Sequence, residues 1–560
     1  MIGEIKINSS RKKIYEKMGY WGDKTLLDYW NVSVKDYADR EFVVDDRGYR
    51  YTYKEIDEKA GVIASYFIKV GIEPGDVISF QIPVWSEFVL IVVACMKVGA
   101  VINPIGMCYD EKEVVYLLNL TESKIFICPT LYHKTDYEKS IISAKKYIKS
   151  LSNVVLLDNL KTKKSENVTL KEILSTYTTL ADEVKVNSND VAAVLFTSGT
   201  TGHTKGVMLT HNNIIFSERY FNRELSLTKD DVMFMPAPLN HATGFHHGII
   251  APMFIGAKVI LQSRFKSKEA IELMNAEKCT YSMGSTPFIY DILNDMENEG
   301  LRLNSLKFYL CGGAPVPGNM VRRAYEYGVK LCEVYGSTES VPHAFVRLDE
   351  TLELMGSTSG RPVEGVEVRI VDENRQDVFP GTVGEEVSRG PNVFVGYINN
   401  KKATDKVLDD EGWFYSGDLC VGDEDGNIKI VGRKKDMIIR GGENLNPNII
   451  GSYIVECPMI QDQAVIGMPD ERLGERICAY VVLKSEQRSL TLKKLLKYLK
   501  QKRIPKRYWP ERLEIIGEIP RTDSGKVKKN LLREDLKLRM HKEELVCENR
   551  NLGQGDLKRL

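Results

Sequence analysis

Short apolar runs alternate with amphipathic segments over about the first 430 residues of the chain. The apolar runs predict buried strands, and the longer segment 86–98, which is followed by Gly99, predicts a helix. Strands separated by helices form βαβ units with parallel sheets. We therefore expect an α/β fold here. The predicted strands lie at residues 76–82, 101–102, 124–128, 154–157, 258–261 and 307–311.

The pattern changes after about residue 360. Segments 366–371 and 385–389 alternate apolar and polar residues, with glycines between them, and this predicts a small antiparallel β subdomain. A charged stretch, 432–436, precedes a region that predicts a small α+β domain. Its expected elements are strands at 464–467 and 479–483 and a lysine-rich helix at 491–502. The last residues, 541–560, are polar and are expected to fray.

The composition is that of an ordinary globular protein. Hydrophobic residues make up 43% and charged residues 28% of the 560-residue chain, which is too long for one core. Lys+Arg and Asp+Glu both number 77, so the net charge is zero. This balance argues against nucleic acid or an anionic membrane as the main partner.

Cysteines and apolar segments indicate a cytoplasmic protein. The 10 cysteines form no C-x-x-C pair, and several lie in apolar runs, so buried thiols are expected rather than disulfides or a zinc site. The N-terminus lacks the apolar region of a signal peptide. The apolar run 88–96 is far shorter than the roughly 20 residues that span a bilayer. No transmembrane segment is predicted; peripheral membrane contact stays open.

Residues 197–206 suggest a phosphate-binding loop. The segment, Thr-Ser-Gly-Thr-Thr-Gly-His-Thr-Lys-Gly, follows an apolar run at 191–196. Glycines allow close approach of the backbone to an anion, hydroxyls and amides donate to its oxygens, and lysine adds positive charge. Unlike a P-loop, which requires G-x-x-x-x-G-K-[ST] before a helix, this loop is followed by an apolar run, 207–210, that predicts a strand. The loop is therefore expected to join two strands.

The loop and the motifs that follow it resemble those of adenylate-forming acyl-CoA synthetases. Within this superfamily the chain is most similar to bacterial short- and medium-chain fatty-acyl-CoA ligases. The other motifs are Cys-Gly-Gly-Ala-Pro (311–315), Val-Tyr-Gly-Ser-Thr-Glu (334–339), Trp-Phe-Tyr-Ser-Gly-Asp (413–418), Gly-Arg-Lys-Lys-Asp (432–436), Gly-Gly-Glu-Asn (441–444) and Pro-Arg-Thr-Asp-Ser-Gly-Lys (520–526).

The resemblance implies a reaction in two halves. A carboxylic acid attacks the α-phosphate of ATP to give acyl-AMP and pyrophosphate, and coenzyme A then displaces AMP to give the thioester. ATP, Mg²⁺ and coenzyme A are the implied cofactors, and a small carboxylic acid is the implied partner. A monomer or a homodimer is expected. The implied catalytic residues are Lys526, His241, Thr338 and Glu339.

The resemblance also assigns the nucleotide site. Thr338 contacts the α-phosphate, Glu339 and Thr200 are implied as Mg²⁺ ligands, Tyr335 stacks on adenine, and Asp418 and Arg433 bind the ribose. The remaining nucleotide-binding residues implied by the motifs are Thr197, Ser198, Gly199, Thr201, Gly202, Lys205, Gly313, Ala314, Pro315 and Gly336.

The remaining implied sites serve domain movement and the substrates. Lys435 occupies the hinge position, about which the small domain rotates to withdraw Lys526 and to bring Gly441 and Gly442 to coenzyme A. His241 orients the carboxylate or gates the acyl pocket. The implied pocket is small and apolar, which favours a hydrophobic chain. Its residues are Gly244, Phe245, Gly284, Ser285 and Gly312, with Gly248, Thr286 and Pro287 as neighbours.

Two departures from the family pattern stand out. Thr204 replaces the proline of the phosphate loop, which removes a fixed φ angle. Residues 449–451, Ile-Ile-Gly, replace an E-x-E motif, and Gly451 is expected to weaken the first helix of the small domain. This second change puts the efficiency of thioester formation in question.

These observations predict an acid–thiol ligase. The large domain is expected at 1–433, the hinge at 434–436, the mobile α+β domain at 437–540 and a polar tail at 541–560. The large domain should combine stacked βαβ-type subdomains with the β subdomain. The expected substrate is a short- or medium-chain fatty acid. The alternatives are an aryl or alicyclic acid, acyl transfer to a carrier-protein phosphopantetheine, or a non-catalytic acyl-binding protein.

Overall fold

The structure is a computed structural model of the chain. It describes residues 3–157, 167–180, 184–197, 204–313, 316–441, 443–484, 487, 489–522 and 525–555. The chain divides into two compact units, each described by itself. The first comprises Met1–Val371, Glu386–Ser416 and Gly422–Lys429; the second comprises Asp372–Glu385, Gly417–Val421 and Ile430–Leu560.

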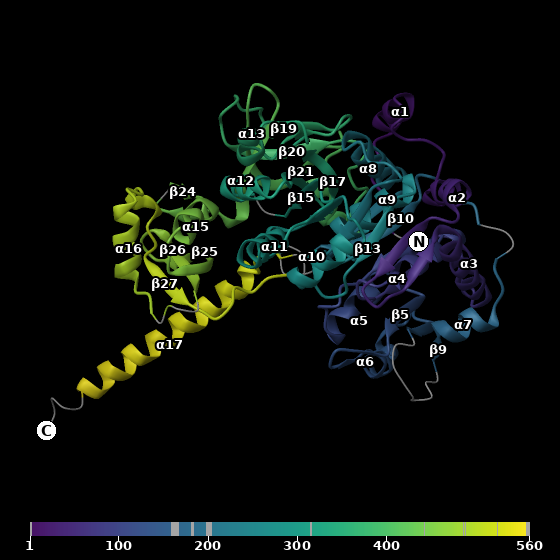
Figure 1. Cartoon of the computed structure of the whole chain (residues 1–560). Coiled ribbons are helices and arrows are strands. Elements are labelled where there is room, and N and C mark those ends of the chain that lie inside the picture. The colour runs from purple at the N-terminus through teal and green to yellow at the C-terminus, as the bar shows by residue number, and fades with distance from the viewer. Residues whose placement is uncertain are drawn as a thin grey trace. The chain divides into compact units, whose positions relative to one another are not determined.

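The first unit contains a seven-stranded sheet whose centre is parallel, with an antiparallel pair at one edge (Figure 1). That pair is β10 and β11, so the predicted loop joins two strands, as expected. In spatial order the strands are β11 (Lys205–Thr210), β10 (Val191–Thr197), β4 (Val101–Pro104), β3 (Val77–Phe80), β5 (Ile125–Pro129), β8 (Asn153–Leu157) and β9 (Val168–Thr169).

A nine-stranded sheet forms the other half of the first unit. Its six central strands run parallel, and antiparallel strands close both edges. The spatial order is β18 (Arg361–Pro362), β17 (Ser340–Phe345), β16 (Lys330–Ser337), β15 (Phe308–Gly312), β14 (Tyr281–Gly284), β12 (Val232–Met235), β13 (Lys258–Leu261), β1 (Glu41–Asp45) and β2 (Arg50–Thr52).

Helix α4 (Ser86–Val98) lies in the common core of these two sheets. Its residues are buried on every side except at Glu87, and they pack in one cluster with residues of both sheets, such as Phe80 and Val259. A helix that is apolar all round belongs in a protein interior. The run 88–96 is thus a core element. Within the described residues, no helix is both long and apolar enough to cross a membrane.

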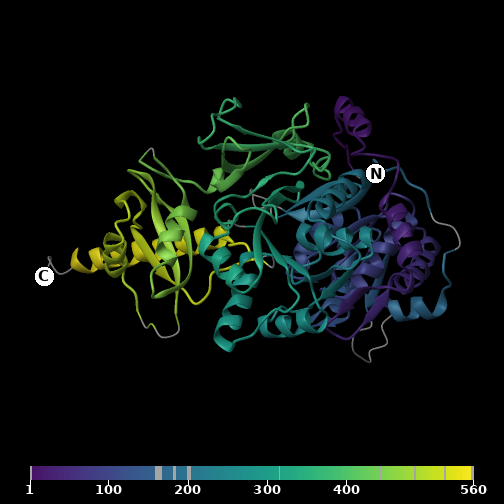
Figure 2. The same cartoon turned by 45° about the horizontal axis from the view of Figure 1, so that its top comes forward.

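The other helices of the first unit flank the sheets (Figures 1 and 2). Several begin at a threonine whose hydroxyl accepts from the backbone one turn later, as Thr210 does for α8. The helices are α1 (Ser9–Lys17), α2 (Leu26–Tyr37), α3 (Tyr53–Lys69), α5 (Glu111–Leu120), α6 (Tyr137–Ala144), η1 (Lys145–Tyr147), α7 (Leu170–Thr176), α8 (His211–Glu224), η2 (Thr243–Ile250), α9 (Ala251–Ile255), α10 (Ser267–Ala276), α11 (Thr286–Glu299), α12 (Gly318–Glu326), α13 (Leu352–Ser357) and α14 (Lys401–Val407); β6 (Leu131–Tyr132) and β7 (Thr135–Asp136) form a small hairpin.

A four-stranded sheet corresponds to the predicted β subdomain. The segments expected to alternate, 366–371 and 385–389, are strands β19 (Glu367–Val371) and β20 (Gly384–Arg389). The other two strands are β21 (Phe414–Gly422) and β22 (Ile428–Arg433).

The second unit is built on a five-stranded sheet. Helices α15 and α16 share one apolar cluster with this sheet, and α17 packs with β25 through Leu532 and Leu536. The strands are β23 (Ile438–Arg440), β24 (Glu443–Leu445), β25 (Ile460–Asp470), β26 (Gly474–Leu483) and β27 (Arg512–Ile515); the helices are η3 (Lys434–Asp436), α15 (Pro447–Val455), α16 (Leu492–Gln501), η4 (Lys506–Tyr508) and α17 (Lys529–Gly555).

The predicted α/β fold class is confirmed, with two local corrections. Strand β25 is much longer than the predicted 464–467, since its polar residues also pair with β26. The chain after residue 540 is helical as far as Gly555 rather than frayed, because α17 is rich in leucine, lysine and glutamate. Gly451 lies within α15 and is buried, and a Cβ there would lie 2.5 Å from Nε2 of Gln463; the expected weakening of this helix stays a prediction.

Buried thiols also follow the prediction. Every cysteine whose side chain is described is free, and all of these except Cys108 are buried. Burial raises the pKa of the Cys311 and Cys332 thiols to about 12, so both stay protonated and unreactive at neutral pH.

Candidate active site

The carboxyl ends of parallel strands β14, β15 and β16 bring several predicted residues to one edge of the nine-stranded sheet. The register pairs Gly284 with Cys311 and Gly312 with Val334. In open α/β sheets, ligands bind at this edge, outside the carboxyl ends of the strands. The residues gathered here include Gly284, Ser285, Gly312, Gly313, Thr338 and Glu339.

The predicted phosphate-binding loop begins and ends on the hairpin of β10 and β11. Thr197 of β10 is paired with Lys205 of β11, so both ends of the loop are held by the sheet. Lys205 is half-buried, and this burial lowers its pKa, an effect that the nearby Glu339 carboxylate opposes. The predicted loop residues Ser198, Gly199, Thr200, Thr201 and Gly202 lie outside the described residues.

Thr338 and Glu339 form the tight turn between β16 and β17. Ser337 and Ser340 pair across this turn, and Thr338 is buried. The Glu339 carboxylate accepts a hydrogen bond from the Tyr397 hydroxyl, with Oη and Oε1 2.7 Å apart. The turn therefore holds a hydroxyl and a carboxylate in fixed, adjacent positions.

A single carboxylate of this kind fits the demands of Mg²⁺. Among the described residues, no group of three or more His, Cys, Asp or Glu side chains is arranged to hold a metal ion by itself. Mg²⁺ is commonly bound by one or two carboxylates together with waters and substrate phosphates. Glu339, close to Lys205 of the β10–β11 hairpin, matches that mode of binding.

The predicted adenine site is a well-packed corner of the same edge. Gly313 has φ of +89°, a left-handed conformation that favours glycine. The Tyr335 hydroxyl donates to Oε2 of buried Glu386 at 3.1 Å, and the ring meets His343 edge-on. Gly336 has no room for a side chain, since a Cβ would lie 2.9 Å from the Ser340 carbonyl oxygen. Ala314 and Pro315 lie outside the described residues.

The predicted acyl-pocket segment is a π-helix. Element η2 contains Gly244, which touches the chain before it: a Cβ there would lie 2.3 Å from the Pro238 carbonyl oxygen. His241 precedes the π-helix and its carbonyl oxygen accepts from the Phe245 amide at 2.9 Å. π-Helical turns are rare and are frequent at functional sites.

A buried carboxylate holds this π-helix. Glu218 of α8 accepts from Nδ1 of His246 at 3.1 Å and from Nδ1 of His247 at 2.9 Å. Burial favours a high pKa for Glu218, but its interactions with both imidazoles outweigh this effect, and its pKa is lowered. Burial lowers the pKa of His246. Glu218 thus anchors two consecutive residues of η2.

The remaining predicted residues belong to the second unit. Asp418 is buried, and its Oδ1 is 2.8 Å from Nε of Arg433, so these two predicted ribose-binding residues meet. Lys435 is exposed in the short turn η3. Gly441 has φ of +60° and its amide donates to the Leu473 carbonyl oxygen. Gly442 lies outside the described residues.

Lys526 lies in a closed hairpin turn of the second unit. Its amide donates to Oγ1 of Thr522 at 3.1 Å, and its carbonyl oxygen accepts from the Thr522 amide at 2.8 Å. Arg521 donates to the Gly525 carbonyl oxygen and pairs with Asp462 on β25. The turn that carries Lys526 is therefore tied to the sheet of its own unit.

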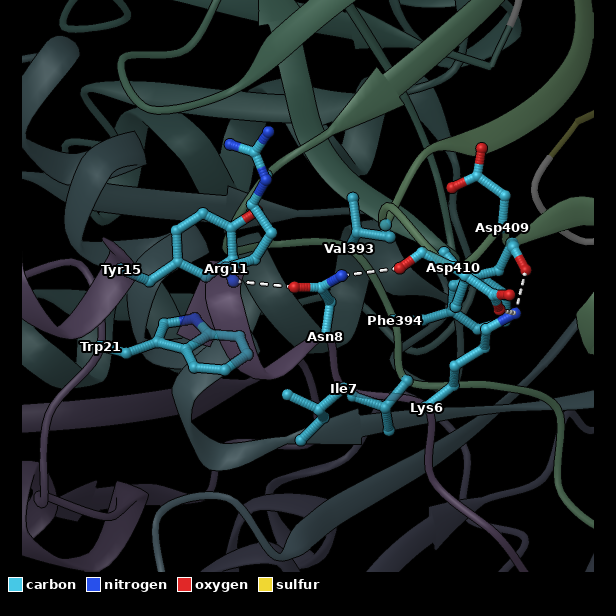
Figure 3. A pocket seen from close by; sticks show the side chains of 14 residues that line it. Lys6, Ile7, Asn8, Arg11, Tyr15, Trp21, Val393, Phe394, Asp409 and Asp410 are labelled. Carbon is cyan, nitrogen blue, oxygen red and sulfur yellow. Dashed lines mark hydrogen bonds and ion pairs between the residues drawn. The ribbon is translucent and has the colours of Figure 1, made fainter. Parts of the chain in front are cut away.

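A separate cavity of about 200 Å³ lies between the N-terminal segment and residues 390–412 (Figure 3). The Asn8 amide donates to the Asp410 carbonyl oxygen at 2.6 Å, and Nζ of Lys6 is 2.9 Å from the Asp410 carboxylate. None of the predicted site residues lines this cavity. Residues 393–395 form part of its lining, and the cavity is distinct from the sheet edge described above.

Comparison with known proteins identifies the family. The description "AMP-binding enzyme" matches residues 30–398, and "AMP-binding enzyme C-terminal domain" matches residues 450–526. The chain belongs to the AMP-binding enzyme family. The two matched ranges contain most of the motifs named above.

Two curated relatives match most of the chain. The chain is 44% identical over 544 residues to the medium-chain fatty-acid–CoA ligase of Escherichia coli (strain K12), covering 97% of this chain and 96% of the relative. It is 33% identical over 520 residues to a putative acyl-CoA synthetase of Bacillus subtilis (strain 168), covering 89% and 94%. Among solved structures, ATP-bound MatB from Rhodopseudomonas palustris superposes with a TM-score of 0.81 at 26% identity, covering 92% and 99%.

Two side chains at this site are absent from the sequence-based set. Tyr397 and Glu218 lie 58 and 28 residues along the chain from the partners that they contact, Glu339 and His246. Neither belongs to one of the recognised motifs. For Glu218, the sequence shows only an acidic residue between apolar residues of segment 211–224.

Proposed function

We propose that this AMP-binding enzyme is an ATP-dependent ligase that joins a short- or medium-chain fatty acid to coenzyme A. The observation that carries the proposal is the 44% identity, over nearly the whole chain, to a medium-chain fatty-acid–CoA ligase. Medium chain length is accordingly the favoured preference. The reaction uses ATP and coenzyme A as co-substrates and Mg²⁺ as cofactor.

The first half-reaction forms acyl-AMP. A carboxylate oxygen of the fatty acid attacks the α-phosphorus of ATP, and the bond from that phosphorus to the bridging oxygen breaks, releasing pyrophosphate. Both reactants are anionic, so catalysis requires positioning and neutralisation of charge. Thr338 is proposed to contact the α-phosphate. Lys205, Thr197 and the loop between them are proposed to contact the outer phosphates. When bound at Glu339, Mg²⁺ neutralises charge on phosphate oxygens.

Lys526 is the proposed catalytic cation of this step. Its turn is held by bonds to Thr522 and by Arg521, so its position follows that of the second unit as a whole. The ammonium is proposed to reach the α-phosphate and the carboxylate, where negative charge grows in the transition state. Asp418 and Arg433 are proposed to hold the ribose hydroxyls, and Tyr335 to stack on adenine.

The second half-reaction forms the thioester. The thiol sulfur of coenzyme A attacks the acyl carbon and loses its proton, and AMP leaves with the oxygen that the acid supplied. Rotation about Lys435 is proposed to withdraw Lys526 and to bring Gly441 and Gly442 to the coenzyme A thiol. Asp436, the residue after the proposed hinge, is paired with Lys529 and Arg533.

The pocket chemistry favours an aliphatic acid. Phe245, Gly244 and Gly284 are buried, and His241 and Ser285 are the polar residues of the predicted set. Each methylene of the substrate that becomes buried should contribute about 0.8 kcal/mol, or about a fourfold gain in affinity. An aryl acid is the second candidate, since the chain is also 27% identical to a 2,3-dihydroxybenzoate–AMP ligase of Bacillus subtilis (strain 168). The reaction is proposed for the cytoplasm.

A panel of acids tests this proposal. The purified protein is incubated with ATP, Mg²⁺ and coenzyme A and one acid from acetate to palmitate, or benzoate or cyclohexanecarboxylate, and AMP release is measured. We expect kcat/KM to rise about fourfold per methylene up to a medium chain length and then to level off or fall. A clear preference for benzoate would overturn the fatty-acid assignment.

A further inference from the structure

Residues 393–398 link the β10–β11 hairpin to the turn between β16 and β17 that carries Glu339. On one side, the Ile398 amide donates to the Gly206 carbonyl oxygen at 2.8 Å. On the other side, the Phe394 amide donates to the Glu339 carbonyl oxygen at 2.9 Å. The segment thus forms a direct backbone connection between the strand that begins at Lys205 and the turn that carries Glu339.

Tyr397, within this segment, contacts both charged side chains. Its hydroxyl donates to Oε1 of Glu339 at 2.7 Å, and Nζ of Lys205 lies 4.4 Å from the centroid of its ring. A cation over an aromatic face is attracted to the ring, and a hydroxyl bonded to a carboxylate restricts the rotamers of that carboxylate. One side chain therefore orders two groups of opposite charge.

Tyr397 is itself held firmly. The side chain is buried, and its amide donates to Oγ1 of Thr404 at 2.9 Å, while Thr404 in turn donates to the Asn400 carbonyl oxygen. Val207 and Tyr397 also form an antiparallel bridge. The position of Tyr397 is therefore set by the fold before any nucleotide binds.

We propose that Tyr397 is a positioning residue for Mg²⁺·ATP: its hydroxyl presents the Glu339 carboxylate to the cation, and its ring presents the Lys205 ammonium to the phosphates. This inference rests on the proposed function. The two parts of Tyr397 serve different groups, so they are separable by substitution. The hydroxyl governs the metal-dependent part of nucleotide binding, and the ring governs a part that does not require metal.

Two substitutions separate these parts. Tyr397→Phe removes the hydroxyl and keeps the ring, so it should weaken binding of Mg²⁺·ATP about tenfold, the effect of losing a hydrogen bond to a charged group. Binding of ATP in excess EDTA should stay unchanged. Tyr397→Leu also removes the ring and should weaken binding in both conditions.

The test is calorimetric titration of ATP without fatty acid, with Mg²⁺ and with EDTA. Tyr480→Phe is the matched control, because Tyr480 is also buried and its hydroxyl donates to a carboxylate, that of Asp535, at 2.8 Å in the second unit. We expect the control to keep the wild-type ratio of the two dissociation constants. The thioester step, started from synthetic acyl-AMP and coenzyme A, should keep its rate in Tyr397→Phe.

Several results would overturn the inference. One is an unchanged ratio of the dissociation constants with Mg²⁺ and with EDTA in Tyr397→Phe, whether neither constant changes or both weaken equally. Another is a wild-type protein that does not distinguish Mg²⁺·ATP from ATP. If Tyr397→Leu fails to fold, Tyr397→Phe alone still decides. Failure of the proposed function would look different, since nucleotide binding would persist while no acid supported exchange of pyrophosphate into ATP.

Discussion

His211 gives a stability prediction whose size follows from its surroundings. The side chain is buried at the start of α8, and its Nδ1 accepts a hydrogen bond from the Leu26 amide at 3.2 Å. Burial lowers the pKa of His211 from 6.5 to about 4, although the charges of Asp190 and Asp28 act in the opposite direction. The folded protein therefore keeps this imidazole neutral under conditions in which the unfolded chain protonates it.

The sign and the size of the effect follow from proton linkage. Well above pH 6.5 neither state binds the proton, so His211 has no effect on the pH dependence there. As the pH falls from 6.5 towards about 4, the unfolded chain gains a proton that the folded protein does not, and stability is lost. At about 1.36 kcal/mol per unit of pKa, the whole loss is about 3 kcal/mol.

The assay compares the parent with His211→Asn, whose side chain keeps an acceptor for the Leu26 amide but does not titrate. Urea unfolding of both proteins is followed by tryptophan fluorescence between pH 7.5 and 4.5. We expect the parent to lose about 2–3 kcal/mol more than the variant over this interval, because the other titrating groups are common to both. Equal losses in the two proteins would refute the reasoning about His211.

Three further substitutions, one of them with a control variant, test the site. Lys526→Ala should lower pyrophosphate exchange about 100-fold or more and leave thioester formation from supplied acyl-AMP in place, whereas Lys528→Ala should have little effect; loss of both half-reactions would exclude the assigned role. Lys435→Pro should block thioester formation and preserve most of the pyrophosphate exchange, and equal losses would contradict the hinge. Glu218→Ala leaves two imidazoles buried without their acceptor and should lower the free energy of unfolding by about 3–5 kcal/mol, measured in urea at pH 7.5; a change below about 1 kcal/mol would show that Glu218 does not anchor η2.

The sequence predicts the fold well where local pattern and tertiary packing agree. Residues 86–98 form the predicted helix, and Gly99 ends it in a left-handed conformation. The pattern fails where packing decides. The polar residues of β25 are held by their pairing with β26, a neighbour that their own position in the chain does not reveal.

The candidate site divides along the same line. Glu339 and Lys526 are found from motifs, because their neighbours in sequence mark them. Tyr397 and Glu218 act through partners that are distant in sequence and become adjacent only in the fold. Composition and periodicity contain no signal for such contacts, so the residues that orient the predicted groups emerge from the structure alone.

The most direct test of the central claim follows the oxygen atoms of the substrate. Octanoate labelled with ¹⁸O in its carboxylate is incubated with the protein, ATP, Mg²⁺ and coenzyme A, and the products are analysed by mass spectrometry. Because the acid attacks the α-phosphorus, the account predicts that one ¹⁸O leaves with AMP, that the other remains in the thioester carbonyl of octanoyl-CoA, and that pyrophosphate is unlabelled. ADP with labelled inorganic phosphate, or AMP whose release does not depend on the acid, would contradict it.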